Sequence, residues 1–303
     1  MPKLTKLLKH LRLPSIPLEL TQAQRLFHGR GHAFQGLHHI TIDWLPPVIL
    51  ITLFAPESET NINKLSDKLL LLLPSCKSIQ LQHRYELRGP IDVIWGKKIT
   101  QLIIDENGLK YHIQLGKSRN TGLFLDIKNG RSWVQSQAKN KRVLNLFAYT
   151  CGFSVAANAG GATSILNVDM SSPALNIGRE NHRLNQKSLE HVKFEKLNIF
   201  KSFGRLKKRG PFDLLVCDPP TLQKGSVNII KDYPKIMNRL HEFMAPRSTL
   251  LLCLNAPELN ADFLLSNMSK FAPQYKYSES ISTPDVFAEA EDKGLIVLVF
   301  KSH

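Results

Sequence analysis

Cysteine is scarce in this sequence, and its four cysteines are far apart. Cys76, Cys151, Cys217 and Cys253 form no CxxC pair and have no histidine at a metal-ligand spacing. Zinc sites and disulfide frameworks need such spacings. We therefore expect no metal site, and reduced thiols as in a cytoplasmic protein.

Long apolar runs are also missing. The leucine run at 69–73 is far too short to cross a bilayer and fits one buried face of a helix. The N-terminus is basic but has neither the apolar segment nor the small-residue cleavage site of a secretory signal. A mitochondrial-type presequence is a weaker alternative. The sequence thus predicts a cytoplasmic protein without a membrane partner.

Acidic residues are few relative to basic ones. The chain has 40 Lys and Arg against 25 Asp and Glu, which gives a net charge of +15. Residues 1–40 contain six basic residues and the single acid Glu19, and a second basic cluster, KKRG, lies at 207–210. Charge gathered in two places indicates a polyanionic partner, although a need for solubility would also explain a basic chain.

A length of 303 residues allows a small domain and a large one. Residues 1–38 are predicted to form a basic N-terminal arm. Residues 39–115 predict a small α+β domain that binds RNA or is accessory. Within it, two strand-like runs flank the proline pair at 46–47, and Asn-Gly at 107–108 supplies a hairpin turn.

Strands and helices alternate from residue 116 to residue 303. Strands are expected at 142–148, 164–169, 191–197, 212–218, 248–255 and 294–300. Amphipathic helices are expected at 153–159, 173–185, 228–244 and 260–271. This order predicts an α/β fold with a mostly parallel sheet that helices cover on both faces. Ligands of such sheets bind at the carboxyl ends of the strands.

The first two strand ends indicate a nucleoside site. Gly152 opens the helix after the first strand, where free N–H groups meet an anion. Asp169 closes the second strand seventeen residues later, a spacing suited to a carboxylate that accepts ribose hydroxyls. The alternative is that Asp169 only caps the next helix. The GxGxxG pattern of NAD and FAD enzymes is absent from this turn.

The next two strand ends carry Asn198 and Asp218. An asparagine amide at this place would read an adenine edge, or would simply form a turn. Asp218 stands before two prolines that hold the backbone extended. A carboxylate so placed would hold polar hydrogens of a substrate and remove a proton from it.

The segments VLNLFAYTCGF, NVDMS, NIFKS and CDPPTLQKGS, in this order and spacing, resemble the class I S-adenosylmethionine-dependent methyltransferases. The preceding stretch ENGLKYHIQLGKSRNTGLFLDIKNGRSWV is similar to the bacterial 23S ribosomal RNA methyltransferases of the guanine-N7 and cytosine-C5 group. The similarity spans about 40–300. It implies a Rossmann-like domain at 116–303 with a seven-stranded sheet, S-adenosyl-L-methionine as cofactor, and 23S ribosomal RNA or a pre-50S particle as partner. A monomer and a homodimer both stay open.

The resemblance also implies the residues of the site. It assigns cofactor contacts to a lid, the first turn and two strand ends: Phe124, Asp126, Arg131, Phe147, Tyr149, Thr150, Gly152, Asp169, Met170 and Asn198. It assigns the methyl-transfer site to Asp218, Pro219 and Pro220.

Two departures from the family pattern bear on the reaction. Cys151 replaces a glycine that is common in relatives, so we expect weaker cofactor binding. Methylation of cytosine C5 needs a thiolate, and the position expected to carry it is Asn255, with Cys253 about 6.6 Å back along the strand. The thiolate mechanism is therefore disfavoured. A nitrogen of the base is the predicted target, with Asn255 bonded to the base edge.

RNA contacts are predicted at Arg30, Lys224, Lys231 and Tyr233, the last by stacking on a base. Ordinary solvated side chains explain each of these as well. The leading hypothesis is an RNA methyltransferase. The alternatives are a non-catalytic or weakly catalytic rRNA-binding assembly factor, a cytosine-C5 RNA methyltransferase, and a small-molecule or protein methyltransferase.

Overall fold

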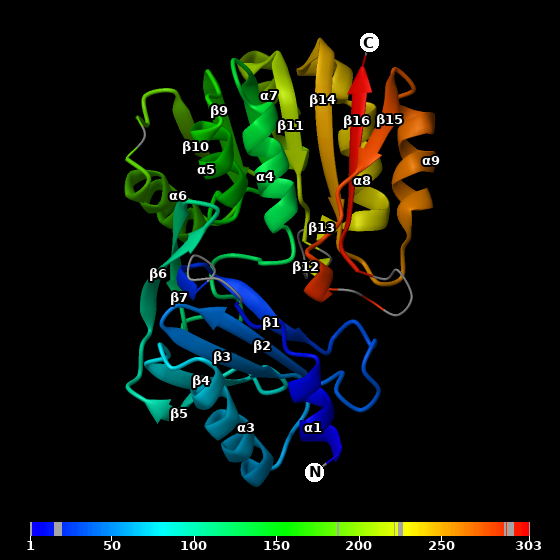
Figure 1. Ribbon diagram of the computed structural model, residues 1–303. Helices are drawn as coiled ribbons and strands as arrows, with labels where there is room; N and C mark the ends of the chain where they lie inside the picture. The colour runs from blue at the N-terminus through cyan, green and yellow to red at the C-terminus, as the bar shows by residue number, and fades with distance from the viewer. Residues whose placement is uncertain are drawn as a thin grey trace. The chain divides into compact units, whose positions relative to one another are not determined.

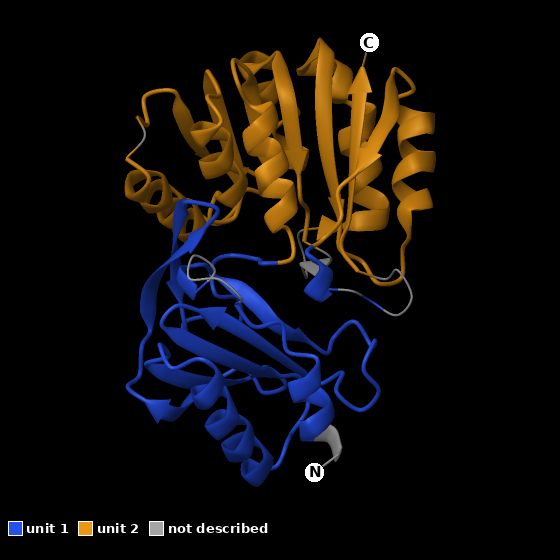
Figure 2. Cartoon of the chain, in the orientation of Figure 1, with its two compact units in different colours: residues 1–125, 284–291 blue, residues 126–283, 292–303 orange. Residues whose placement is uncertain are grey.

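The computed structural model describes residues 2–14, 20–186, 188–220, 222–223, 227–287, 289 and 294–302. The chain divides into two compact units, residues 1–125 with 284–291 (unit 1) and residues 126–283 with 292–303 (unit 2) (Figure 2). Within the described ranges, no helix is long and apolar enough to cross a membrane.

Unit 1 is built on a five-stranded sheet of order β1-β2-β3-β4-β5 (Figure 1). The strands are β1 (Gln24–His28), β2 (Ile40–Leu45), β3 (Val48–Leu53), β4 (Ser78–His83) and β5 (Ile91–Gly96). β3 and β4 are parallel and the other neighbours antiparallel. Apolar residues of α1 (Pro2–Lys9) and α3 (Glu59–Leu72), such as Leu7 and Leu65, share one core with the sheet.

The N-terminal segment differs from the loosely packed arm that its charge suggested. β1 pairs with β2, and Leu26 and Phe27 are fully buried. Two adjacent large apolar side chains make this pairing favourable despite the surrounding positive charge. The segment 284–291 also joins unit 1, where the short helix η3 (Asp285–Phe287) packs beside β1.

The predicted hairpin is present in unit 1. β6 (Gln101–Glu106) and β7 (Leu109–Gln114) pair antiparallel around Asn107 and Gly108, whose φ angles are 55° and 77°. Positive φ at both central residues is the requirement of a two-residue hairpin turn, which asparagine and glycine meet at low cost.

Unit 2 contains a seven-stranded sheet of order β10-β9-β8-β11-β14-β16-β15. The strands are β8 (Arg142–Leu146), β9 (Ser164–Asp169), β10 (Val192–Lys196), β11 (Phe212–Cys217), β14 (Met244–Leu254), β15 (Tyr275–Ser280) and β16 (Ile296–Ser302). Only β16 runs against its two neighbours in this described sheet. The α/β class and the mostly parallel sheet are confirmed.

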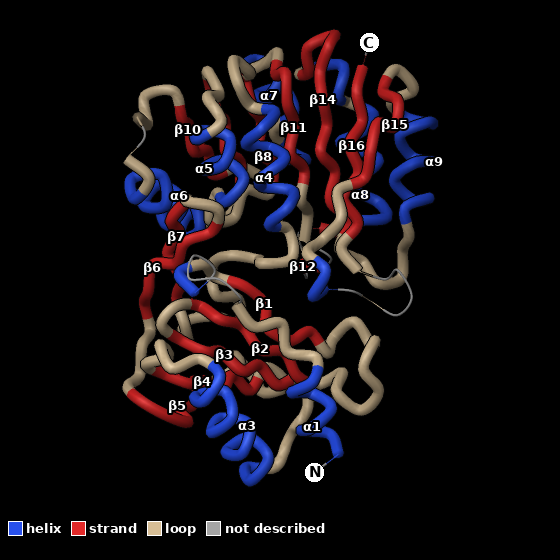
Figure 3. The backbone as a smooth tube through the Cα atoms, viewed as in Figure 1, coloured by secondary structure: helices blue, strands red, loops and turns tan. Residues whose placement is uncertain are grey.

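Helices pack on both faces of this sheet, and Figure 3 shows them in blue beside the red strands. α4 (Lys128–Gln137) and α5 (Gly152–Ala159) pack on one face, and α6 (Ser172–Leu184) lies beside α5. α7 (Phe203–Arg209), α8 (Ile229–Asn238) and α9 (Ala261–Phe271) pack on the other. A short ribbon, β12 (Leu222–Gln223) and β13 (Val227–Asn228), precedes α8.

The strand order fixes where a ligand binds. The chain proceeds from β8 outward to β9 and β10, and then returns to the other side of β8 with β11. Connections therefore leave the sheet in opposite directions between β8 and β11, which opens a crevice at their carboxyl ends. Asp169 and Asp218 stand at carboxyl ends that flank this point.

Candidate active site

The turn after β8 has a backbone that is rare for its residue types. Phe147, Tyr149 and Cys151 have φ angles of 56°, 47° and 63°. Non-glycine residues in this region are strained by about 1–2 kcal/mol each, and such strain gathers at binding sites. The turn delivers the chain into α5, whose first N–H groups face the crevice end of the sheet. The sequence signal for this turn was only Gly152, which begins the helix.

Asp169, the last residue of β9, is hydrogen-bonded to this turn. Its Oδ2 accepts the Tyr149 N–H at 2.8 Å, and its Oδ1 accepts the Ser171 N–H at 2.7 Å. The N-cap of α6 is Ser171, so Asp169 is not the cap that the alternative hypothesis required. Each carboxylate oxygen has a second lone pair, so Asp169 keeps the capacity to accept further hydrogen bonds, such as those of a ribose diol.

Cys151 packs against α6. Its side chain is fully buried, and a Cβ placed on Gly178 would come within 2.4 Å of its sulfur. The amide of Asn181 donates to the carbonyl of Thr150 at 2.9 Å, which fixes the same turn. Cys151 therefore fills space that the bare backbone of Gly178 leaves. Burial raises the pKa of this thiol far above its ordinary value, which keeps it protonated near neutral pH.

Asn198 offers an acceptor suited to an adenine amine. Its side-chain oxygen is buried and makes no hydrogen bond within the described part of the chain. Buried acceptors without a partner are rare, and a bound ligand is one way to satisfy them. Phe147 lies near Phe200, with ring centroids 6.2 Å apart, and Met170 is 47% exposed beside Asp169. These side chains fit an adenosyl group.

Asp218 has an unusual acidity. Burial raises its pKa to about 7, the negative charge of Asp126 adds to this, and Arg131 and a hydrogen bond from Cys253 oppose it. Two carboxylates close together cannot both ionise easily, so one of them holds its proton near neutral pH. A carboxyl group with a pKa near the working pH is suited to proton transfer. The Asp126–Asp218 pair was not predicted from the sequence, because the two lie 92 positions apart.

The remaining transfer-site residues differ in exposure. Pro219 is buried, whereas Pro220 and Asn255 are exposed at the ends of β11 and β14. Cys217 and Cys253 are both fully buried, as expected, and burial raises the pKa of each thiol. The negative charge of Asp218 raises the pKa of the Cys253 thiol further. A thiolate is therefore disfavoured at this end of the sheet.

Tyr233 does not fit the predicted role of stacking on a base. Its ring is buried in the core on the α8 side of the sheet. Its hydroxyl lies 3.1 Å from the carbonyl oxygen of Cys217 and 3.0 Å from that of Cys253, and it donates to them. The apolar face of α8 points this side chain inward, and the hydroxyl finds its partners in the strand ends. Tyr233 joins β11 to β14 immediately before Asp218 and Asn255.

The three residues expected to form a lid, Phe124, Asp126 and Arg131, are divided between the two units. Arg131 is buried on α4. This helix packs closely on α5: a Cβ on Gly160, at the end of α5, would lie 2.0 Å from the carbonyl oxygen of Gln135 in α4. Asp126 and Arg131 thus belong to the body of unit 2 and act on Asp218 from there. Phe124 belongs to unit 1, where it is 43% exposed.

The predicted RNA contacts belong to different units of the chain. Lys231 is exposed in the first turn of α8, with its N–H bonded to Asn228 at 3.1 Å. Arg30 is exposed in unit 1. Lys224 lies outside the described residues.

The strand order, the strained turn and the two carboxylates at the ends of β9 and β11, on either side of β8, are the features of a protein that binds a nucleoside cofactor. Comparison with known proteins identifies the family. Residues 24–301 match the model of S-adenosylmethionine-dependent methyltransferases, and the chain belongs to that family. The resemblance seen in the sequence and the expected cofactor, S-adenosylmethionine, are confirmed.

Among curated relatives, the chain is similar to ribosomal RNA large subunit methyltransferase I of Tolumonas auensis. The two are 31% identical over 240 residues, which cover 76% of this chain and 60% of the relative. A Bacillus subtilis protein described as a candidate ribosomal RNA large subunit methyltransferase is 28% identical over 88% of this chain and 70% of its own length. The chain spans about 57–60% of the length of the Aeromonas and Tolumonas relatives.

A solved structure has the same fold. It is a methyltransferase crystallised with S-adenosylhomocysteine, and it covers 93% of this chain and 76% of that one with a TM-score of 0.84 at 24% identity.

Proposed function

We propose that the protein transfers a methyl group from S-adenosylmethionine to a base nitrogen of large-subunit ribosomal RNA. The observation that carries the proposal is Asp218, a carboxyl group with a pKa of about 7 at a strand end beside the switch point. Its substrate would be 23S RNA, naked or in a pre-50S particle, in the cytoplasm. The names of the relatives and the net charge of +15 support RNA as the substrate class.

The proposed division of labour follows the geometry. When bound, S-adenosylmethionine supplies an electrophilic methyl group on a sulfonium. Asp169 would accept the ribose hydroxyls, and Asn198 Oδ1 would accept the adenine amine. Asn255 would bond the edge of the target base, so that its nitrogen lies in line with the methyl group. As the new N–C bond forms, the broken S–C bond would leave its electron pair on the sulfur. Asp218 would take the proton from a target nitrogen that carries one, such as an amino group.

The buried thiols favour nitrogen over carbon as the target. Methylation at cytosine C5 needs a thiolate that adds to the ring. The thiols at this end of the sheet, Cys217 and Cys253, are fully buried with raised pKa values. The lone pair of a base nitrogen needs no such step.

The test is transfer of labelled methyl from S-adenosylmethionine to undermethylated ribosomal RNA, supplied naked and as subunits, followed by nucleoside mass spectrometry. We expect an N-methylated base. The rate at saturating RNA should fall about tenfold for each pH unit below about 7, as Asp218 takes up a proton. Asp218→Asn should retain cofactor binding and lose at least about 100-fold in rate. Asp262→Asn, an exposed carboxylate on α9, is the matched control.

Three outcomes would count against the proposal. A 5-methylcytidine product would show carbon chemistry. A pH profile that is flat through 7, or near-full turnover by Asp218→Asn, would remove Asp218 from the reaction. Cofactor binding without label in any RNA would favour a non-catalytic binding role, and Asp169→Ala should abolish even that cofactor binding.

A further inference from the structure

At one edge of the sheet in unit 1, two arginines lie over an aromatic ring, and the charge of a third arginine acts on one of them. β1, β3 and β4 run in the same direction, because β2 is antiparallel to both β1 and β3 while β3 and β4 are parallel. Their carboxyl ends therefore share one edge. Arg30 follows β1, Phe54 follows β3 and Arg84 follows β4.

Cation–π contacts and hydrogen bonds fix the arginines at this edge. The guanidinium carbon of Arg30 lies 4.3 Å from the Phe54 ring centroid, and that of Arg84 lies 5.7 Å from it. Arg84 donates to the carbonyl of Arg119 and, at 2.9 Å, to the side chain of Asn120. Arg119 donates at 3.2 Å to the carbonyl of Glu86. The three guanidinium groups are thus fixed by an aromatic face and by neutral acceptors.

The positive charge at this edge is not neutralised by the described carboxylates. None of them forms an ion pair with Arg30, Arg84 or Arg119. Burial and the charges of Arg119 and Arg30 lower the pKa of Arg84, which shows that like charges surround it. Holding three cations together without acids costs stability, and such sites commonly serve an anionic partner.

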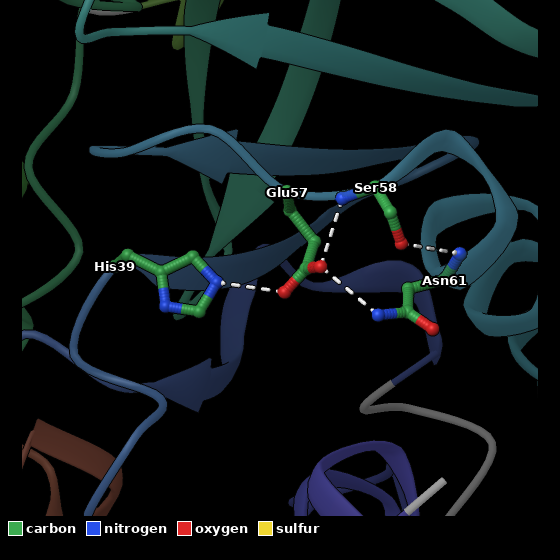
Figure 4. Close-up of polar contacts among 4 residues, drawn as sticks. All are labelled: His39, Glu57, Ser58 and Asn61. Carbon is green, nitrogen blue, oxygen red and sulfur yellow. Dashed lines mark hydrogen bonds and ion pairs between the residues drawn. The ribbon is translucent and has the colours of Figure 1, made fainter.

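The acids nearby in the sequence have other partners. Figure 4 shows the Glu57 carboxylate bonded to His39 at 3.1 Å, to the Ser58 N–H at 2.8 Å and to Asn61 at 2.9 Å. Burial alone would raise the pKa of Glu57, but these hydrogen bonds and the charge of His39 together bring it below its usual value. The same bonds fix the segment between Phe54 and α3. The Glu86 carboxylate lies 4.0 Å from His83.

We propose that Arg30 and Arg84 over Phe54, together with Arg119, form a docking site for the phosphate backbone of an RNA strand. This inference rests on the proposed function for its partner. Arginine forks bind phosphate oxygens in pairs, and a guanidinium stacked on an aromatic face keeps its N–H edge free for them. Tyr85, 39% exposed beside Arg84, offers a ring on which a base stacks. The site would hold substrate RNA, while the crevice of unit 2 performs the transfer.

The test uses the full chain with Arg30→Gln and Arg119→Gln combined, since both side chains are exposed and Arg84 is partly buried. The matched control is Lys64→Gln with Lys68→Gln, which removes the same charge from the exposed face of α3. The affinity for undermethylated 23S RNA fragments is measured as a function of salt, together with the cofactor affinity and the transfer rate at saturating RNA.

The arginine pair should weaken RNA binding on the order of tenfold at 0.1 M salt and flatten the salt slope by about 1.4, the value for two lost phosphate contacts. The control should change the affinity less than about twofold. Cofactor affinity and the rate at saturating RNA should stay unchanged. The variant with Arg30→Lys and Arg119→Lys should show the wild-type salt dependence of RNA affinity, because lysine restores both positive charges.

The outcomes separate this inference from the proposed function. Equal losses in the arginine pair and the control, or no recovery with lysine, would overturn the docking site even where methyl transfer is found. Selective loss of RNA binding by the arginine pair would support the docking site even where the wild-type chain transfers no methyl group.

Discussion

The turn after β8 keeps three non-glycine residues in left-handed backbone, and the neighbours of each residue explain how this is tolerated. Cys151 has its sulfur against the bare Cα of Gly178, and the N–H of Tyr149 is bonded to Asp169. Tyr149 itself has a raised pKa, first through burial and then through the charge of Asp169. The strain is thus offset by packing and by a charged hydrogen bond, which is typical of a turn shaped for a ligand.

The fit between Cys151 and Gly178 can be tested as a pair. Gly178→Ala alone places a Cβ 2.4 Å from the Cys151 sulfur and should destabilise the protein by about 1–3 kcal/mol. With Cys151→Gly as well, the clash disappears. The alanine at position 178 should then raise the free energy of unfolding by about 0.5–1 kcal/mol relative to glycine, because alanine favours the helix interior. Urea unfolding of the four proteins in this double-mutant cycle measures the coupling.

Cofactor affinity gives the cycle a functional readout. Cys151→Gly removes left-handed strain from the turn, so S-adenosylmethionine should bind at least as tightly as to the wild-type chain. Additive stability changes in the cycle would contradict the proposed fit. Weaker cofactor binding by Cys151→Gly would show that the side chain supports the site.

The ends of β11 and β14 are tied together by one hydroxyl from α8. Tyr233→Phe removes it and leaves the carbonyls of Cys217 and Cys253 without their donor, which should cost about 1–2 kcal/mol of stability. Asp218 and Asn255 follow these carbonyls, so the transfer rate at saturating RNA should fall about tenfold, with cofactor affinity unchanged.

Tyr275→Phe is the matched control for this variant. It also removes a buried hydroxyl of the same sheet, bonded to Ser248 at 2.7 Å, far along β14 from Asn255. The control should lose stability without losing rate at saturating RNA. A rate loss of the same size in both variants would mean that Tyr233 acts only through general stability.

Elements were predicted from the sequence better than their contacts. The strands predicted from the sequence match β8, β9, β10, β11 and β16 within two residues at each end. For β8, β9 and β11 the signal was the continuous apolar run that a buried parallel strand requires. The helix expected at 228–244 ends at Asn238, and α4 and β15 were not predicted. β15 has one buried residue, so it lacks the apolar signal of the others. The inward direction of Tyr233 depends on which face of α8 meets the sheet, which its sequence alone does not give.

Across the whole molecule, the unit boundary was the least predictable feature. Unit 1 gains β1 and the distant segment 284–291, and neither has a local signal for that partnership. Pairings between distant segments are set by which apolar surfaces match in the folded chain, not by composition near a boundary. The strand ends could be predicted to lie together because parallel strands leave a sheet on the same side. The Asp126–Asp218 pair and the arginine edge needed the fold.

Global stability should depend on a buried polar network in unit 2. His182 lies 2.7 Å from Ser154 through Nε2 and 3.2 Å from Asn158 through Nδ1. Asn158 accepts from His191 at 2.9 Å, and Ser154 accepts from Asn167 at 2.9 Å. Asn158 therefore offers a donor to His182, which suits the neutral imidazole with its proton on Nε2. Burial, and then the charge of His191, lowers the pKa of His182 to about 4.

This pKa predicts a loss of stability in mild acid. The unfolded chain binds the proton below about 6.5 and the folded chain only below about 4, so the free energy of unfolding falls as pH falls between these values. The loss attributable to His182 is about 2 kcal/mol between pH 7 and pH 5. Urea unfolding at several pH values should show a shallower dependence for His182→Gln than for the exposed control His241→Gln. Identical slopes for the two variants would mean that His182 has the same pKa in the folded and unfolded chains, so that burial does not lower it.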